Sequence, residues 1–246
     1  MIISISSRFA GRAFSLLLGA ALGLTLVSFV TNAYVYFPYR GFPFEVLSTL
    51  DDAKNPGILW LNVDEEMSIP TWFSSSVLLL CAVLLTILSI GRRGGEVYAL
   101  HWKALAVIFF LLSIDEAVGF HEMAIGPVGS VLNEPGGFLY FTWVVPGGAF
   151  VLIFALTYLR FLLSLPPRTR RLCIVAALLF VCGALVMEMI SGRHAAQYGY
   201  QNLTYVALTT TEEVLEMLGG IIFLYALMLH TGSHKTDAAN HGKSLT

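Results

Sequence analysis

Six runs of apolar residues set the strongest limit on the folds that are open to this sequence. In the first run, no charged residue occurs between Ala13 and Val30. A helix of about 20 apolar residues crosses the roughly 30 Å hydrocarbon layer of a membrane. Only 12% of the 246 residues are charged and 57% are hydrophobic, whereas a soluble domain has about 25% charged residues. We therefore predict an all-α, polytopic membrane protein that folds as a six-transmembrane-helix bundle.

Charged residues and turn signals mark the ends of the predicted spans. We expect a single transmembrane domain at 1–230 and a disordered tail at 231–246. A cleaved signal peptide is a competing interpretation of the first run, but that run is longer than a usual signal core, so we favour a retained helix. Between the first two spans lies a long acidic loop at 37–71, either a solvated connection or a lid over a site below it. The six predicted spans are 13–36, 72–90, 104–122, 137–163, 172–190 and 204–229.

The distribution of positive charge predicts the orientation of the bundle. If the chain starts inside the cell, eleven of its fourteen Lys and Arg residues lie on the side of the N-terminus. Loops on the cytoplasmic side of a membrane carry an excess of Lys and Arg. Both termini are therefore expected to be cytoplasmic, and the loop at 37–71 is expected to be external.

The third run differs from the others because acids follow while the segment is still apolar. Asp115 lies roughly 18 Å from Lys103 by helical rise, which places it past the midplane of the membrane. An ionisable group at that depth costs several kcal/mol unless it is paired, coordinated or in contact with water. Such residues therefore indicate a functional site.

Polar residues of three spans converge at similar depth in the outer half of the membrane. Glu212 and Glu216 are i, i+4 neighbours on one face of the sixth span, with Glu213 at the edge of that face. The polar residues of the third span cannot all point at one atom from a regular helix. Either the span bends, or some of these residues act indirectly. The candidate site residues are Asp115, Glu116, His121, Glu122, Glu188, His194, Glu212 and Glu216.

A cluster of carboxylates in a region of low dielectric needs positive charge, and three solutions remain open. Our leading interpretation is a divalent metal (iron, manganese or zinc) bound by those eight residues, in an oxidoreductase or hydrolase with Glu116 and Glu216 as catalytic residues. The alternative is a proton- or cation-coupled small carrier whose acids are protonated in turn. The third is a structural subunit of a membrane complex. The residues do not decide whether the protein is an enzyme.

A Pro-Gly-Gly triplet at 146–148 lies at about the same depth as these acids. Proline removes a backbone donor and clashes with the preceding turn. We therefore predict that the triplet breaks or kinks the fourth span beside the site.

The segment SIDEAVGFHE at 113–122 resembles a helix of uncharacterised multi-pass bacterial membrane proteins, in which a Ser-x-Asp-Glu helix ends in His-Glu. The resemblance implies a functional set made of Asp115, Glu116, His121 and Glu122. It also implies a location in the cell membrane, the inner membrane of a bacterium. We expect membrane lipid around the protein, a homo-oligomer or a larger membrane complex as its assembly, and no nucleic-acid partner.

Overall fold

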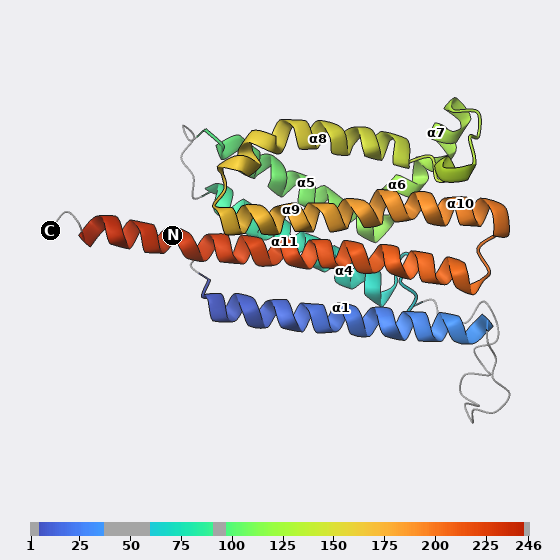
Figure 1. The fold of residues 1–246 in the computed structure, drawn as a ribbon, viewed down its shortest axis with the longest axis horizontal. Coiled ribbons are helices and arrows are strands. Elements are labelled where there is room, and N and C mark those ends of the chain that lie inside the picture. The colour runs from blue at the N-terminus through green and yellow to red at the C-terminus, as the bar shows by residue number, and fades with distance from the viewer. Residues whose placement is uncertain (1–4, 37–59, 91–96, 244–246) are drawn as a thin grey trace, which may run out of the picture.

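The computed structural model describes residues 5–36, 60–90 and 97–243, with side chains at 5–33, 60–90 and 97–232. Within these residues the fold is all-α, which confirms the predicted class (Figure 1). The elements are α1 (Ser7–Tyr36), α4 (Ile69–Ile90), α5 (Ala99–Val118), α6 (Phe120–Met123), α7 (Ile125–Val131), a 3-10 turn (Gly137–Leu139), α8 (Val144–Ser164), α9 (Pro167–Val181), a π-helical stretch (Cys182–Met187), α10 (Glu188–Tyr198) and α11 (Leu203–Lys243).

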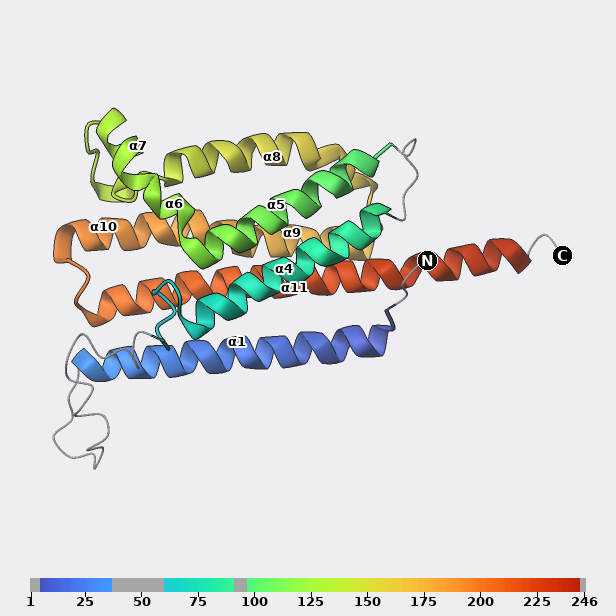
Figure 2. The same cartoon turned by 180° about the vertical axis from the view of Figure 1, so that it is seen from behind.

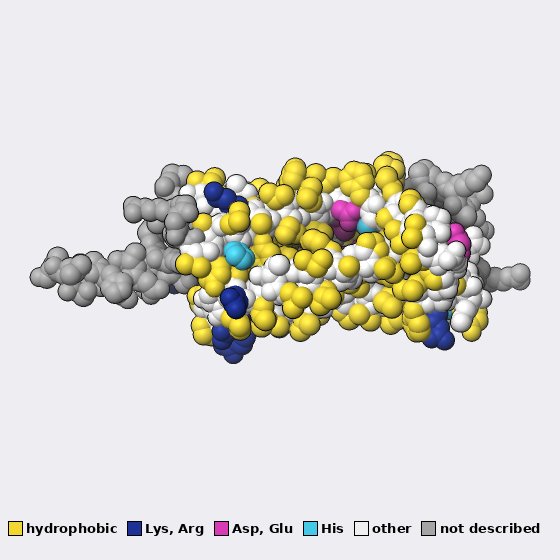
Figure 3. Space-filling view, turned by 90° about the horizontal axis from the view of Figure 1, so that it is seen from above, with side chains coloured by type: hydrophobic (Ala, Val, Ile, Leu, Met, Phe, Trp, Pro, Cys, Tyr) yellow, Lys and Arg dark blue, Asp and Glu magenta, His cyan; other side chains and the backbone are white. Residues whose placement is uncertain are grey.

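Most of these helices have the length and surface of membrane-spanning helices. In the part of the chain that the structure describes, five helical segments are long and apolar enough to cross a membrane, and the bent pair of α5 with α6 and α7 would make a sixth. On α8, the side chains of Leu152, Leu156 and Leu163 are 56% to 68% exposed. A soluble protein rarely exposes so many large apolar side chains together. Figure 3 shows an almost wholly apolar face, with Lys and Arg confined to its two ends.

Helix α11 lies at the centre of the bundle and packs against α1, α4 and α9. α4 and α5 run side by side and cross α9 and α11 obliquely (Figure 2). Close approach of α9 to α11 requires a glycine at 219. A Cβ atom there would lie 2.8 Å from the Cβ of Phe180 and 2.9 Å from the carbonyl oxygen of Ala176. Small residues at such contacts let two membrane helices pack backbone to backbone.

The predicted third span, 104–122, bends sharply near its end. α5 ends at Gly119, which adopts the left-handed conformation with φ of 65° and donates its N–H to the carbonyl of Asp115. The segment that follows, Phe120–Val131, is turned by 73° from the axis of α5. This bend confirms the expectation that a regular helix could not direct all of its polar residues to one place.

The predicted break in the fourth span is wrong. α8 begins only at Val144, so Pro146 occupies its first turn and Gly147 and Gly148 follow without interruption. The first four N–H groups of a helix have no partner within the helix, so proline there removes no hydrogen bond. The triplet therefore lies at the start of α8 and does not kink it.

Two other boundaries differ from the prediction. The helical run that begins with α9 continues to Tyr198, past the expected end at 190. α11 continues to Lys243, although a disordered tail was expected from 231 onward. The sequence after Leu229 contains no proline, so nothing in it forces the helix to stop. Residues 37–59 of the predicted external loop lie outside the described residues.

Candidate functional site

A cavity of about 340 Å³ runs through the bundle between α5, α8, α9 and α11. We call the end of the bundle that carries α6, α7 and the α10–α11 connection the mouth end. Ten carboxylate residues line the cavity, and no Lys or Arg is among its described lining residues. They are Asp64, Glu65, Glu66, Asp115, Glu116, Glu122, Glu188, Glu212, Glu213 and Glu216.

Three of these acids come from the segment that precedes α4, which hydrogen bonds hold against α1 and α4. The backbone N–H of Val63 donates to the hydroxyl of Ser28 in α1 over 3.0 Å. The hydroxyl of Thr71 in α4 donates to the carbonyl of Glu65 over 2.9 Å. The described end of the acidic loop thus contributes directly to the cavity wall.

The three acids of this segment lie in an environment that favours their neutral forms. The surrounding protein excludes water from the carboxyl of Asp64 and, together with Glu65, Glu188 and Glu122, raises its pKa to about 7, although much of the Asp64 residue stays exposed. Burial, followed by repulsion from Glu122, also raises the pKa values of Glu65 and Glu66. Like charges in a region of reduced dielectric cannot all remain ionised.

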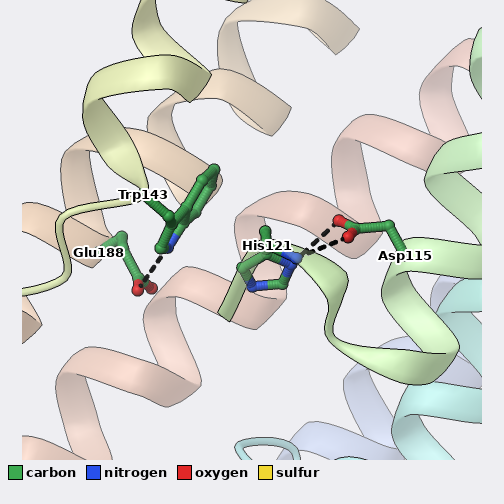
Figure 4. A network of polar contacts seen from close by, with 4 residues as sticks. All are labelled: Asp115, His121, Trp143 and Glu188. Carbon is green, nitrogen blue, oxygen red and sulfur yellow. Dashed lines mark hydrogen bonds and ion pairs between the residues drawn. The ribbon is translucent and has the colours of Figure 1, made fainter. Parts of the chain in front are cut away.

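Asp115 fixes His121 at the bend that follows α5. Its carboxylate accepts the backbone N–H of His121 over 2.9 Å and contacts Nδ1 of the same residue over 2.9 Å. Figure 4 shows His121 between Asp115 on one side and Trp143 with Glu188 on the other. A carboxylate that holds one imidazole nitrogen orients the ring and leaves the other nitrogen for a proton or a ligand.

Side-chain hydrogen bonds join α10 to α11 and to the residue before α8. The indole N–H of Trp143 donates to Glu188 over 2.9 Å, and the hydroxyl of Ser191 donates to Glu212 over 3.3 Å. The carboxyl group of Glu188 also lies close to that of Glu212. Because an ionised carboxylate only accepts, the two groups can share a hydrogen bond only while one of them carries a proton.

Glu216 lies deeper in the cavity and packs against the π-helical stretch. A Cβ atom at Gly183 would lie 2.6 Å from Cγ of Glu216 and 2.8 Å from the carbonyl oxygen of Glu212. π-helical turns inside α-helices occur frequently at functional sites. Within the described residues, no protein group forms a hydrogen bond with the carboxyls of Glu213 and Glu216.

The rest of the cavity is apolar and rich in aromatic rings. On α8, Phe150, Phe154 and Tyr158 follow one another at intervals of four residues, and all three line the cavity. We call these three residues the aromatic ladder. Across the cavity, Phe109 of α5 and Phe223 of α11 stack with their ring centroids 4.5 Å apart. The cavity therefore has an acidic end and an apolar arm.

The structure brings together seven of the eight predicted site residues and leaves out His194. The ring of His194 bonds through Nε2 to Asn202 over 2.8 Å, and Asn202 in turn accepts the N–H of Tyr205 near the start of α11. His194 thus stabilises the α10–α11 connection and does not line the cavity. Within the described ranges, no group of three or more His, Cys, Asp or Glu is arranged so that it could hold a metal ion.

Comparison with known proteins places the chain in a family. A family model described as a domain of unknown function (DUF8692) matches residues 17–231. The chain belongs to the DUF8692 family. The matched range includes every residue that lines the cavity, so the cavity lies within the DUF8692 domain. No curated protein and no solved structure matches this DUF8692 protein.

Several residues of the site were not predicted from the sequence. Asp64, Glu65 and Glu66 lie in the acidic loop, for which the sequence left a solvated connection and a lid open. Trp143 appears in sequence as an ordinary aromatic residue near the start of a span. A tryptophan or serine becomes recognisable as a partner of a buried acid only when the packing of the helices is known.

Proposed function

We propose that this protein is a six-span carrier in the cell membrane, with both termini in the cytoplasm, which exchanges protons for a cation at a site in the outer half of the bilayer. The observation that carries the proposal is the charge of the cavity: ten carboxylate residues and no Lys or Arg among its described lining residues. Uncompensated charge of that density is too costly in a membrane. The acids therefore need protons or another cation at all times.

Competition between protons and a cation for the same oxygens is the coupling step of this proposal. Glu188 and Glu212 hold a proton between them, and a cation that enters displaces it. Glu116, Glu213 and Glu216 lie nearby and offer further oxygens. In this proposal Glu216 and Glu116 gain and lose protons as the cation leaves and enters.

A metal-binding function is the second candidate, favoured by the Asp115–His121 pair. A carboxylate that orients an imidazole is the usual support of a histidine that binds metal. The second ring nitrogen of His121 could bind iron, manganese or zinc, but no group of three or more described His, Cys, Asp or Glu is arranged to hold a metal ion, so this candidate requires the site to rearrange. In this candidate Glu116 and Glu216 keep their predicted catalytic role on a hydrophobic substrate.

Proton release on cation binding tests the carrier proposal. Purified protein in weakly buffered detergent is titrated with NaCl, MnCl₂ and tetraphenylphosphonium chloride while a pH indicator records released protons. We expect at least one of these cations to release protons from wild type and to release clearly fewer from Glu216→Gln. Glu134→Gln is the matched control, because Glu134 is exposed and lies outside the cavity.

The outcomes separate the two candidates. Proton release by Na⁺ or tetraphenylphosphonium, with no metal in elemental analysis of the purified protein, supports the carrier. Stoichiometric transition metal in the purified protein supports the metal candidate instead. If none of the three cations releases protons and the two variants behave alike, the cavity acids do not exchange protons for cations and the carrier proposal fails.

A further inference from the structure

Resting on the proposed carrier function, we propose that the transported cation is organic and elongated. Its charged head lies among the acids, and its apolar body lies along the aromatic ladder. It enters sideways from the lipid, through the face of the bundle that carries α5 and α8. This class of ligand fits four features of the cavity: its length, its aromatic wall, its negative charge and its opening towards lipid.

The cavity is far longer than an inorganic cation requires. Along α5 its lining residues run from Leu105 to Glu116, roughly 16 Å by helical rise. Along α8 they run from Gly147 to Leu162, roughly 22 Å. A volume of about 340 Å³ lies within the range of about 300–1,000 Å³ that is usual for pockets of drug-sized ligands. A metal ion or sodium would use only the acidic end.

The apolar arm has the surface that a hydrophobic cation needs. Ring centroids of Phe154 and Tyr158 are 4.3 Å apart, and those of Phe150 and Phe154 are 6.1 Å apart. Rings stacked in this way form a continuous apolar wall that buries hydrocarbon. An aromatic wall that leads to an acidic end therefore suits a ligand with positive charge at one end of an apolar body.

The charge of the acidic end excludes the main alternative, an anionic lipid. Phosphate or carboxylate heads would face repulsion from the cavity acids without an Arg or Lys on the described wall to offset it. Glu213 and Glu216 have no hydrogen-bonding partner among the described residues. Their oxygens are therefore available to a positively charged head.

An opening in the apolar surface gives the ligand a path from the lipid. Figure 3 looks down on the face that carries α8 and α5, and acidic side chains and a histidine are visible in a gap between apolar ones. Phe150, at the mouth-end side of the ladder, is 50% exposed although it lines the cavity. A ligand dissolved in the outer leaflet can thus reach the acids without crossing water.

Binding of a chain-length series tests this proposal. Alkyltrimethylammonium ions with chains of 4 to 16 carbons compete with radiolabelled tetraphenylphosphonium for the protein in nanodiscs, and protein-free nanodiscs correct for partitioning. We expect affinity, relative to free aqueous ligand, to rise roughly fourfold per added methylene, as for burial of one CH₂ group, until the arm is filled. Alkyl sulfates of the same chain lengths should compete at least tenfold less well.

Two variants on neighbouring positions of α8 locate the tail. Val151 lines the cavity, whereas Leu152 is 61% exposed on the outer surface. Val151→Trp should lower the affinity for long chains at least tenfold while changing that for the 4-carbon ion less than twofold. Leu152→Trp should leave both unchanged. Glu216→Gln should weaken all chain lengths to the same degree.

The results distinguish failure of this inference from failure of the carrier proposal. If Na⁺ releases protons but no quaternary ammonium ion competes, the ligand is inorganic, so this inference falls while the carrier stands. Equal competition by alkyl sulfates, or equal effects of Val151→Trp and Leu152→Trp, would also overturn it. If neither organic nor inorganic cations bind or release protons, both proposals fail.

Discussion

The contact between Gly183 and α11 allows a sharp test of how the site is built. Gly183 lies in the π-helical stretch and faces the backbone of α11 at Glu212 and Glu216. An added methyl group would approach Cγ of Glu216 to 2.6 Å and the carbonyl oxygen of Glu212 to 2.8 Å. The side chain of Glu216 can move aside, but the carbonyl belongs to the helix backbone. Gly183→Ala must therefore push α11 away.

Two opposing terms set the size of the effect. Overpacking a close contact costs about 1–3 kcal/mol, and replacing glycine by alanine within a helix returns about 0.5–1 kcal/mol. We expect a net loss of about 1–2 kcal/mol, which lowers the melting temperature of a chain of this size by about 2–8 °C. Gly148→Ala is the matched control, because a Cβ atom at that helical position has nothing within 4 Å. It should raise the melting temperature by about 1–4 °C.

Thermal unfolding of the two variants in the same detergent measures both effects, and proton release on cation binding reports on Glu216. Because the two substitutions are chemically identical, detergent and helix propensity affect them alike. Melting temperatures that rise equally in both variants would mean that Gly183 is not in tight contact with α11. The π-helical stretch would then have no part in placing Glu216.

Three further predictions concern charge, the bend and orientation. The pKa of Asp64 is raised to about 7, so its contribution to folding stability is complete below the ordinary pKa near 4 and is lost as pH rises through 7. Wild type should therefore have a higher melting temperature at pH 5 than at pH 8, and Asp64→Asn should make the gap between these two temperatures smaller. An unchanged gap would contradict the raised pKa of Asp64. Asp115→Asn removes one of two acceptors for His121 and should cost about 1–2 kcal/mol in thermal unfolding, with Glu134→Gln as a control that leaves the melting temperature unchanged. Reporter fusions after Thr246 should give a cytoplasmic signal, and an external one would overturn the proposed orientation.

Length and hydrophobicity predicted the helices well because membrane spans obey a simple rule. Backbone groups in lipid must be paired within the helix, so a long apolar run has few alternatives. The acids were found for a similar reason, since an acid at depth stands out from an apolar run. Asp115, Glu116 and Glu216 were therefore predicted as site residues and do line one cavity. The sequence also indicated that the third span bends or that some of its polar residues act indirectly, and the structure shows the bend.

Predictions failed where tertiary packing decides between local alternatives. Pro146 is tolerated at the start of a helix and disruptive in its interior, and the sequence does not show where the helix begins. His194 follows Glu188 at the same spacing that separates His121 from Asp115. Only the fold shows that His194 turns towards Asn202. Spacing along a helix predicts which face a residue lies on. Which other helix packs against that face is known only from the fold.

The charge of the cavity links stability to whatever balances it. Acids from the segment before α4, from α5, from the α10 region and from α11 meet in one cavity, so each of these elements depends on the same counter-charge. A cation that binds the folded state stabilises it by an amount that grows with the logarithm of its concentration. Protons do the same, which is why acidic pH is expected to raise stability. At high pH and without a cation, neither protons nor a cation balance the acids. The segment at 60–68 should then loosen first, because only a few hydrogen bonds hold it against the bundle.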